Sequence, residues 1–196
     1  MRGTPSSGKS FAAKKLADET GGKIFSTDDF FGTSPEEYKT NIAKAMADNR
    51  MGYYHMQNQM NVIQAMKRGE SPLIVDNTNT TKKEMAPYVL AAKKFGYAVR
   101  FVEPSDIQAP WMRFGIPEIL KTKDPNRLQW AASKLAFKSK DTHNVPQNVI
   151  LKMLARFEPE PRLGDFDDPA ILKRIHPAIK RELGIEDDPR PVISLN

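Results

Sequence analysis

Gly3-Thr4-Pro5-Ser6-Ser7-Gly8-Lys9-Ser10 is the stretch that decides the fold of this chain of 196 residues. It has the form G-x-x-x-x-G-K-[ST], whose small residues let backbone N–H groups turn toward the phosphates of a nucleoside triphosphate. In this motif Lys9 reaches the β- and γ-phosphates and the Ser10 hydroxyl ligates Mg²⁺. We therefore expect a site for ATP and Mg²⁺, with the nucleotide held by Gly3, Pro5, Ser6, Ser7, Gly8, Lys9, Ser10 and Phe11.

Helical and strand patterns alternate after this loop. The apolar spacing predicts helices over residues 10–19, 54–67, 82–95, 126–138 and 146–158, a further helix that starts at Ser34, and strands over 23–27, 72–75 and 97–102. Such alternation is typical of a parallel sheet with helices on both faces. The predicted fold class is therefore α/β, a three-layer P-loop NTPase with a parallel sheet flanked by helices.

The strand that should precede the loop is expected to be missing or truncated. A phosphate-binding loop normally follows a buried central strand, but only Met1 and Arg2 precede Gly3. Without that strand, the segments over 72–75 and 97–102 would border a gap, pair directly, or receive a segment from elsewhere.

Proline content and charge indicate the boundaries of the regions that follow the loop. We expect a P-loop domain over 1–158, with a proline-interrupted insertion over about 104–145, and an acidic, proline-rich extension over 159–196. Residues 104–157 carry nine basic and four acidic side chains, which favours a polyanionic substrate. The extension contains an amphipathic piece over 169–183, broken near Pro177, which is expected to dock onto the domain.

Hydrophobic residues make up 39% of the chain, which fits a globular protein. Cysteine is absent, which excludes a disulfide scaffold and a cysteine-ligated zinc site. No apolar run approaches membrane-spanning length, and the first residues do not resemble a signal peptide. A cytoplasmic protein without membrane partners is expected; a nuclear location and the oligomeric state are left open.

Several segments together resemble one family. They are GTPSSGKS (3–10), STDDFF (26–31), SPLIVDNTNTTKKEMAPYV (71–89), GYAVRFVEP (96–104) and HNVPQNVILKMLARFE (143–158). The chain is similar to the polynucleotide-kinase-like P-loop kinases, the AAA-type ATPase/kinase domains typified by Nedd-four-binding protein two. The resemblance implies that residues 1–158 form a P-loop kinase domain whose lid lies within about 104–145. It also implies Mg-ATP as phosphoryl donor and a hydroxyl acceptor, in the best-studied members a nucleic-acid 5′ end.

The acids after the strands are candidates for the chemistry. Phosphoryl transfer needs a base near the acceptor oxygen, and Asp28 follows the predicted strand over 23–27 where a base would face the γ-phosphate. The resemblance also assigns the general base to Asp28, whereas Asp29 more often caps the next segment. Asp76 follows the strand over 72–75 as a magnesium or acceptor ligand would, and Thr78 and Asn79 can assist with the substrate.

The family closes a basic lid over the phosphates, usually with an arginine. Here Lys138 occupies that position, and lysine lacks the planar fork of arginine. We expect Lys138 to act in catalysis, Arg127 and Lys140 to contact the substrate, and Arg127 or Arg113 to substitute for the missing arginine.

Three functions are compatible with these residues. The first is an ATP-dependent kinase that acts on a nucleic-acid 5′-hydroxyl end. The second has the same chemistry with a small acceptor such as a nucleoside, sugar or antibiotic. The third is a nucleotide-binding module with little catalysis, which would have no need for the base Asp28.

Overall fold

A computed structural model describes residues 1–140 and 142–185. These residues form a helix-rich α/β fold with one parallel sheet of two strands, β1 (Lys23–Phe25) and β2 (Leu73–Val75). The register pairs Lys23 with Leu73 and Phe25 with Val75. Because parallel strands end at the same edge of a sheet, the residues that follow Phe25 and Val75 are brought together there.

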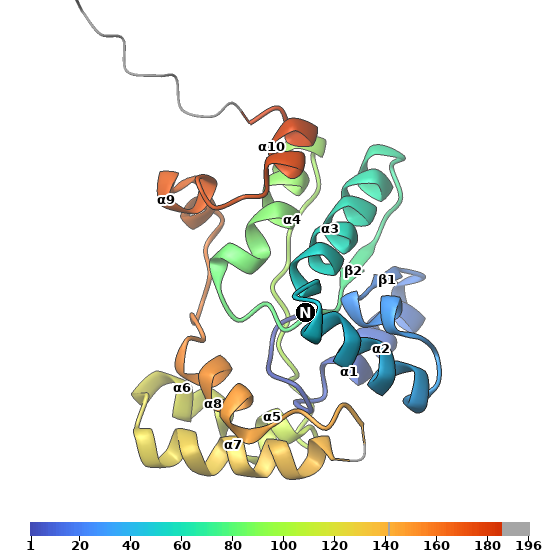
Figure 1. Ribbon diagram of the computed structural model, residues 1–196. Coiled ribbons are helices and arrows are strands. Elements are labelled where there is room, and N and C mark those ends of the chain that lie inside the picture. The colour runs from blue at the N-terminus through green and yellow to red at the C-terminus, as the bar shows by residue number, and fades with distance from the viewer. Residues whose placement is uncertain (141, 186–196) are drawn as a thin grey trace, which may run out of the picture.

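Helices α1 (Lys9–Thr20), α3 (Met51–Lys67) and α4 (Lys82–Phe95) pack around this sheet (Figure 1). A short 3₁₀ helix η1 (Thr27–Phe31) and helix α2 (Pro35–Ala47) connect β1 to α3. The main core joins β1, α3 and α4, and its buried members include Phe25, Val62, Ile63, Met85, Val89 and Ala92. The predicted class, an α/β P-loop fold with a parallel sheet and flanking helices, is confirmed in this reduced form.

A second group of helices, which we call the helical subdomain, lies at the bottom of Figure 1. It consists of α5 (Pro110–Arg113), α6 (Ile116–Thr122), α7 (Pro125–Ser139) and α8 (Gln147–Ala155). It has its own apolar cluster, which includes Trp111, Ile116, Leu128, Leu135, Ile150 and Leu154. Pro110, Pro117 and Pro125 occupy first or second helical positions. These prolines therefore begin helices, where a missing N–H costs nothing, instead of interrupting them.

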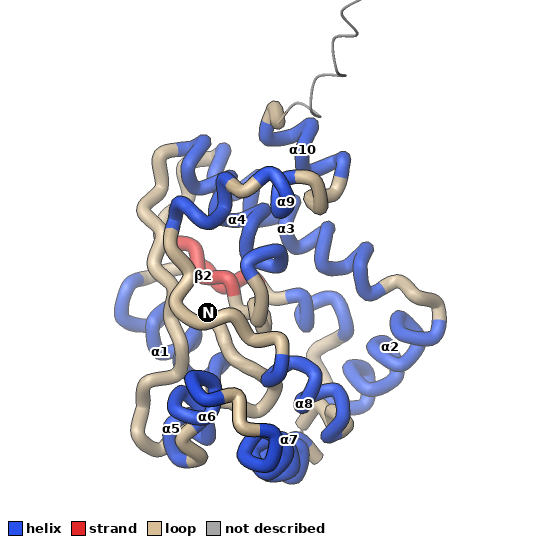
Figure 2. Tube along the Cα trace, turned by 90° about the vertical axis from the view of Figure 1, so that its left-hand side faces the viewer, coloured by secondary structure: helices blue, strands red, loops and turns tan. Residues whose placement is uncertain are grey.

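The strand predicted over 97–102 is not formed, and that prediction was wrong. Residues 1–3 run beside β2, with the Arg2 N–H donating to Val102 O at 2.8 Å and the Gly3 N–H to Thr78 O at 2.9 Å. Figure 2 shows the N-terminus beside β2. A cavity of about 310 Å³ lies between β2 and residues 97–102, and Met1 is among the residues that line it. A strand forms only when a neighbouring strand lies within hydrogen-bonding distance, and residues 97–102 have no such neighbour across this cavity. Of the three outcomes expected from the sequence, the structure therefore shows the gap.

The C-terminal extension docks onto the main core, as its amphipathic pattern predicts. It contains η2 (Leu163–Asp167), α9 (Pro169–Leu172) and α10 (Pro177–Leu183). Its buried residues Phe166, Ile175, Ile179 and Leu183 belong to the same cluster as α3 and α4. The remainder of the expected extension, residues 186–196, lies outside the described residues. Within residues 1–140 and 142–185, no helix combines the length and the apolar character that crossing a membrane requires.

Candidate functional site

The phosphate loop has the backbone that its glycines require. Gly3 has φ +141° and Gly8, the N-cap of α1, has φ +99°, both unfavourable for residues with a side chain. A Cβ atom on Gly3 would lie 2.7 Å from the Ser7 Oγ. The two glycines therefore let the loop fold tightly just before the start of α1, the end of a helix at which phosphate binds.

The Lys9 side chain is buried under this loop. Its ammonium donates to the backbone oxygen of Thr4 at 3.0 Å. Burial lowers the pKa of Lys9, while the carboxylates of Asp76 and Asp28 act in the opposite direction. Lys9 is thus a desolvated cation between the loop and two acids, where an anionic phosphate would be strongly attracted.

A cavity of about 420 Å³, which we call the loop cavity, opens at this point. Its lining brings together most of the residues that the sequence singled out: Pro5, Ser6, Gly8, Lys9, Ser10, Phe11, Asp28, Asp76, Thr78 and Lys138. Gly3 and Ser7 shape the loop behind it. The structure therefore gathers the loop, both strand-end acids and one lid lysine around a single space.

Asp76 lies directly after β2. Its N–H donates to Phe25 O at 2.9 Å, and its own carbonyl accepts from the Ser26 hydroxyl at 3.0 Å. Its Oδ1 is buried and has no hydrogen-bond partner within the described residues, and the hydroxyls of Ser6 and Ser7 share this state. Buried polar atoms are normally satisfied, and Asp76 and Ser6 line the loop cavity, so these two oxygens are placed as ligand-binding groups would be.

The oxygen donors suit magnesium better than a transition metal. Ser10 and Asp76 both line the loop cavity, and Mg²⁺ is usually held by one or two carboxylates together with substrate phosphates. Among residues 1–140 and 142–185, no cluster of three or more His, Cys, Asp or Glu side chains could hold a metal alone. The residues present fit Mg²⁺ bound together with a nucleotide.

The adjacent aspartates in η1 have different surroundings. The Asp29 carboxylate turns back and accepts the Ser26 N–H at 3.2 Å, which completes a capping box. Burial is the main cause that raises the pKa of Asp29. Asp28 instead lines the loop cavity and accepts a hydrogen bond from the Tyr38 hydroxyl at 3.2 Å. The cap role expected of Asp29 is confirmed, and Asp28 is the carboxylate that faces the cavity.

Four further residues of the loop cavity were not predicted from the sequence, and Tyr38 is one of them. The Tyr38 ring contacts His143 with centroids 4.6 Å apart. His55 Nδ1 lies 3.0 Å from the Thr27 hydroxyl, and Asn77 Oδ1 accepts the Thr27 N–H at 3.0 Å. His55, Asn77, Tyr38 and His143 all line the loop cavity. Asn77 belongs to the VDNTNT string, which could have identified it as a site residue. Tyr38 lies in α2, outside any motif, so no sequence signal indicated its role.

Other expected substrate residues lie elsewhere. Arg127 lies near the start of α7 in a hollow with Arg113 and Trp130, away from the loop cavity. Lys140 is exposed, with its ammonium 5.4 Å from the Phe137 ring centroid. Asn79 is buried and donates to Met1 O at 2.9 Å. Neither Arg113 nor Arg127 therefore lines the loop cavity, whereas Lys138 does.

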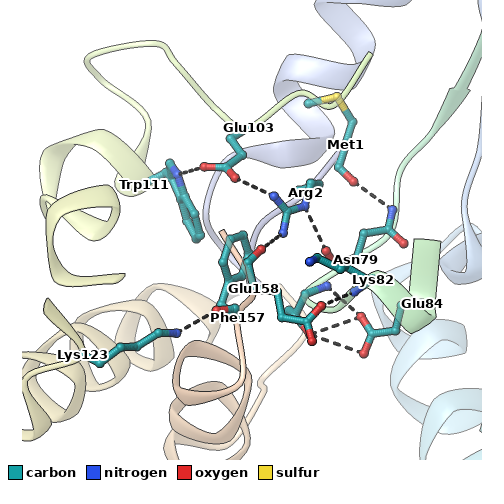
Figure 3. A network of polar contacts seen from close by, with 11 residues as sticks. Met1, Arg2, Asn79, Lys82, Glu84, Glu103, Trp111, Lys123, Phe157 and Glu158 are labelled. Atoms are coloured by element: carbon teal, nitrogen blue, oxygen red, sulfur yellow. Dashed lines mark hydrogen bonds and ion pairs between the residues drawn. The ribbon is translucent and has the colours of Figure 1, made fainter. Parts of the chain in front are cut away.

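Arg2 ties the loop to the helical subdomain (Figure 3). Its guanidinium donates to Glu103 at 3.1 Å, to Asn79 O at 3.3 Å and to Glu158 O. It also stacks 4.6 Å from the ring centroid of Phe157. The base of the phosphate loop is thus fixed to the segment that follows α8.

The parallel sheet, the loop before α1 and the acids at the strand ends define a P-loop nucleotide-binding protein. Residues 1–112 match the family model described as AAA domain, and the chain belongs to this kinase-like P-loop family. It is 31% identical over 159 residues to human NEDD4-binding protein 2, covering 81% of this chain and 7% of that protein. The chain thus spans only a small part of that relative's length. No solved structure matches the chain significantly.

Proposed function

We propose that this protein is an ATP-dependent kinase that transfers the γ-phosphate to a hydroxyl acceptor, a nucleic-acid 5′-hydroxyl end. The observation that carries this proposal is the position of Asp28, which lines the same cavity as Lys9 and Ser10 and is held by Tyr38. A protein that only binds nucleotide has no use for a free carboxylate opposite its phosphate loop.

The residues divide the work of phosphoryl transfer. The loop N–H groups and Lys9 hold the β- and γ-phosphates, and Lys138 adds positive charge from α7. Ser10 and Asp76 would hold Mg²⁺, which neutralises phosphate charge when bound. Thr78 and Asn77 line the same cavity, and we assign them to contacts with the acceptor.

Asp28 is the proposed general base. It takes the proton of the acceptor hydroxyl as the acceptor oxygen forms its bond to the γ-phosphorus. The bond from that phosphorus to the bridging oxygen breaks, and ADP leaves with the electron pair. Tyr38 holds the carboxylate toward the acceptor during this step.

A small acceptor is the second candidate. Ile42, Met46, Met51, Val145, Val149 and Met153 form an apolar wall of the loop cavity. Such a wall fits the ring of a nucleoside or another small molecule without further phosphates.

Transfer of radiolabelled γ-phosphate from ATP to a panel of acceptors tests the proposal. The panel holds 5′-hydroxyl DNA and RNA strands, nucleosides and sugars. Labelling of strands with kcat/KM well above that of nucleosides supports the nucleic-acid reading. Labelling confined to small acceptors selects the second candidate, and no labelling of any acceptor contradicts both.

A further inference from the structure

A second hollow lies beside the loop cavity, and we call it the basic groove. It has a volume of about 340 Å³ and shares His55, Asn77, Thr78 and Met153 with the loop cavity. These shared residues place the two hollows side by side, so a chain molecule with its end at Asp28 would pass over them to reach the basic groove.

The charged side chains that line the basic groove are mainly cationic. Lys83, Arg156 and Arg174 border it together with His176, and Glu84 is the carboxylate among its lining residues. Glu84 is already engaged, because it accepts from Arg156 at 2.9 Å and from the Thr80 N–H at 2.7 Å. Two cations are therefore left without a compensating acid in the groove.

Lys83 and Arg174 are these two cations. Both are exposed, and neither makes an ion pair or a side-chain hydrogen bond within residues 1–140 and 142–185. They come from distant parts of the chain, α4 and the turn between α9 and α10. Their convergence depends on the docking of the C-terminal extension, in which Ile175 is buried against the main core.

The apolar part of the groove complements these charges. Met56, Pro87 and Ile175 contribute to its lining. A groove with cations along an apolar floor fits a single-stranded nucleic acid, whose phosphates need positive charge and whose bases and sugars contact apolar surface.

We propose that the basic groove holds the sugar–phosphate chain of a single-stranded nucleic acid whose 5′-hydroxyl end lies at Asp28. This inference rests on the proposed function and assigns Lys83 and Arg174 to phosphates downstream of the reacting end. It gives the C-terminal extension a role in substrate binding, since it supplies Arg174 and His176.

The test compares two charge-matched double variants. Lys83→Gln/Arg174→Gln removes the two uncompensated cations of the groove. Lys14→Gln/Arg181→Gln removes one lysine and one arginine that are exposed and lie outside the groove. Because all four side chains are exposed, both variants should melt as the wild type does.

Binding is measured first, without ATP, by fluorescence anisotropy of a single-stranded DNA of about twelve nucleotides across a salt series. The groove variant should bind about tenfold more weakly, and the slope of log K against log salt should fall by about 1.4, the value for two lost contacts to a single strand. The control variant should match the wild type. Equal binding by the wild type and both variants would overturn the proposal that the basic groove binds single-stranded nucleic acid.

Transfer is measured separately, with a dinucleotide and with the longer strand as acceptors. The groove variant should raise KM for the longer strand and leave KM for the dinucleotide and for ATP unchanged. A binding defect specific to the groove variant, with no transfer to any acceptor by the wild type, would reject the proposed kinase and retain the groove. Transfer by the wild type with no difference between the variants would reject the groove alone.

Discussion

The Tyr38 hydroxyl donates a hydrogen bond of 3.2 Å to the Oδ1 of Asp28. Burial, followed by the charge of Asp28, raises the pKa of Tyr38, so the phenol remains a proton donor at neutral pH. The bond leaves the second carboxylate oxygen of Asp28 available to an acceptor hydroxyl. Tyr38 is therefore a positioning residue for the proposed base.

Tyr38→Phe should lower kcat about tenfold, the range expected when a hydrogen bond to a charged group is lost. KM for ATP should not change, because Tyr38 is not part of the phosphate loop. Steady-state transfer assays measure both constants, and Tyr53→Phe, at a half-exposed position of α3, is the control. An unchanged kcat would show that Asp28 is positioned without Tyr38.

Asp28→Asn should slow transfer by about 10²–10⁴, the scale of a lost general base, while ATP binding remains. Asp29→Asn should affect stability instead, since its carboxylate caps η1, at a cost of about 0.5–1 kcal/mol. Single-turnover transfer and urea unfolding separate these effects. An active Asp28→Asn beside an inactive Asp29→Asn would reverse the assignment within the pair.

Lys9→Ala should abolish nucleotide binding, because Lys9 is the buried ammonium at the loop. Isothermal titration with ATP and Mg²⁺ gives the affinity directly. The control variant Lys14→Ala, which changes an exposed lysine further along α1, should bind ATP as the wild type does. Unchanged ATP affinity in Lys9→Ala would remove the central role of the loop.

His55 should make the protein less stable in mild acid. Burial lowers its pKa below the ordinary value of about 6.5, outweighing the opposite effects of Glu84 and Asp28. As the pH falls, the unfolded chain binds a proton at this position before the folded chain does, so the free energy of unfolding decreases below about pH 6.5. Urea unfolding at several pH values should show a flatter dependence for His55→Gln; an identical slope would contradict this effect.

Local signals in the sequence predicted much of the fold. The helix expected over 82–95 was found with the same bounds, because Gly96 adopts the left-handed conformation that ends it. Ser34 begins α2 through the capping box that its spacing to Glu37 indicates. The strand over 97–102 failed because apolar residues favour a strand, but a ladder depends on a neighbour that is distant in the chain.

The site, like the fold, could be predicted from the sequence where local motifs place its residues, but not where contacts between distant elements do. The loop motif placed Lys9 and Ser10, and the strand ends placed Asp28 and Asp76. Contacts between elements had no local signal: Tyr38 meets Asp28 through the packing of α2 against η1. Arg127 was expected near the substrate, but α7 runs so that its last turn, with Lys138, faces the cavity.

The contacts of Arg2 set an order for folding during synthesis. Arg2 and Glu158 are 156 positions apart, and at about 5–20 residues per second the ribosome needs about 8–30 s to make the chain between them. Until then the guanidinium lacks the carbonyl and the Phe157 ring that cover it. The phosphate loop is translated before the segment that covers Arg2, so it gains these contacts only after that segment has been made.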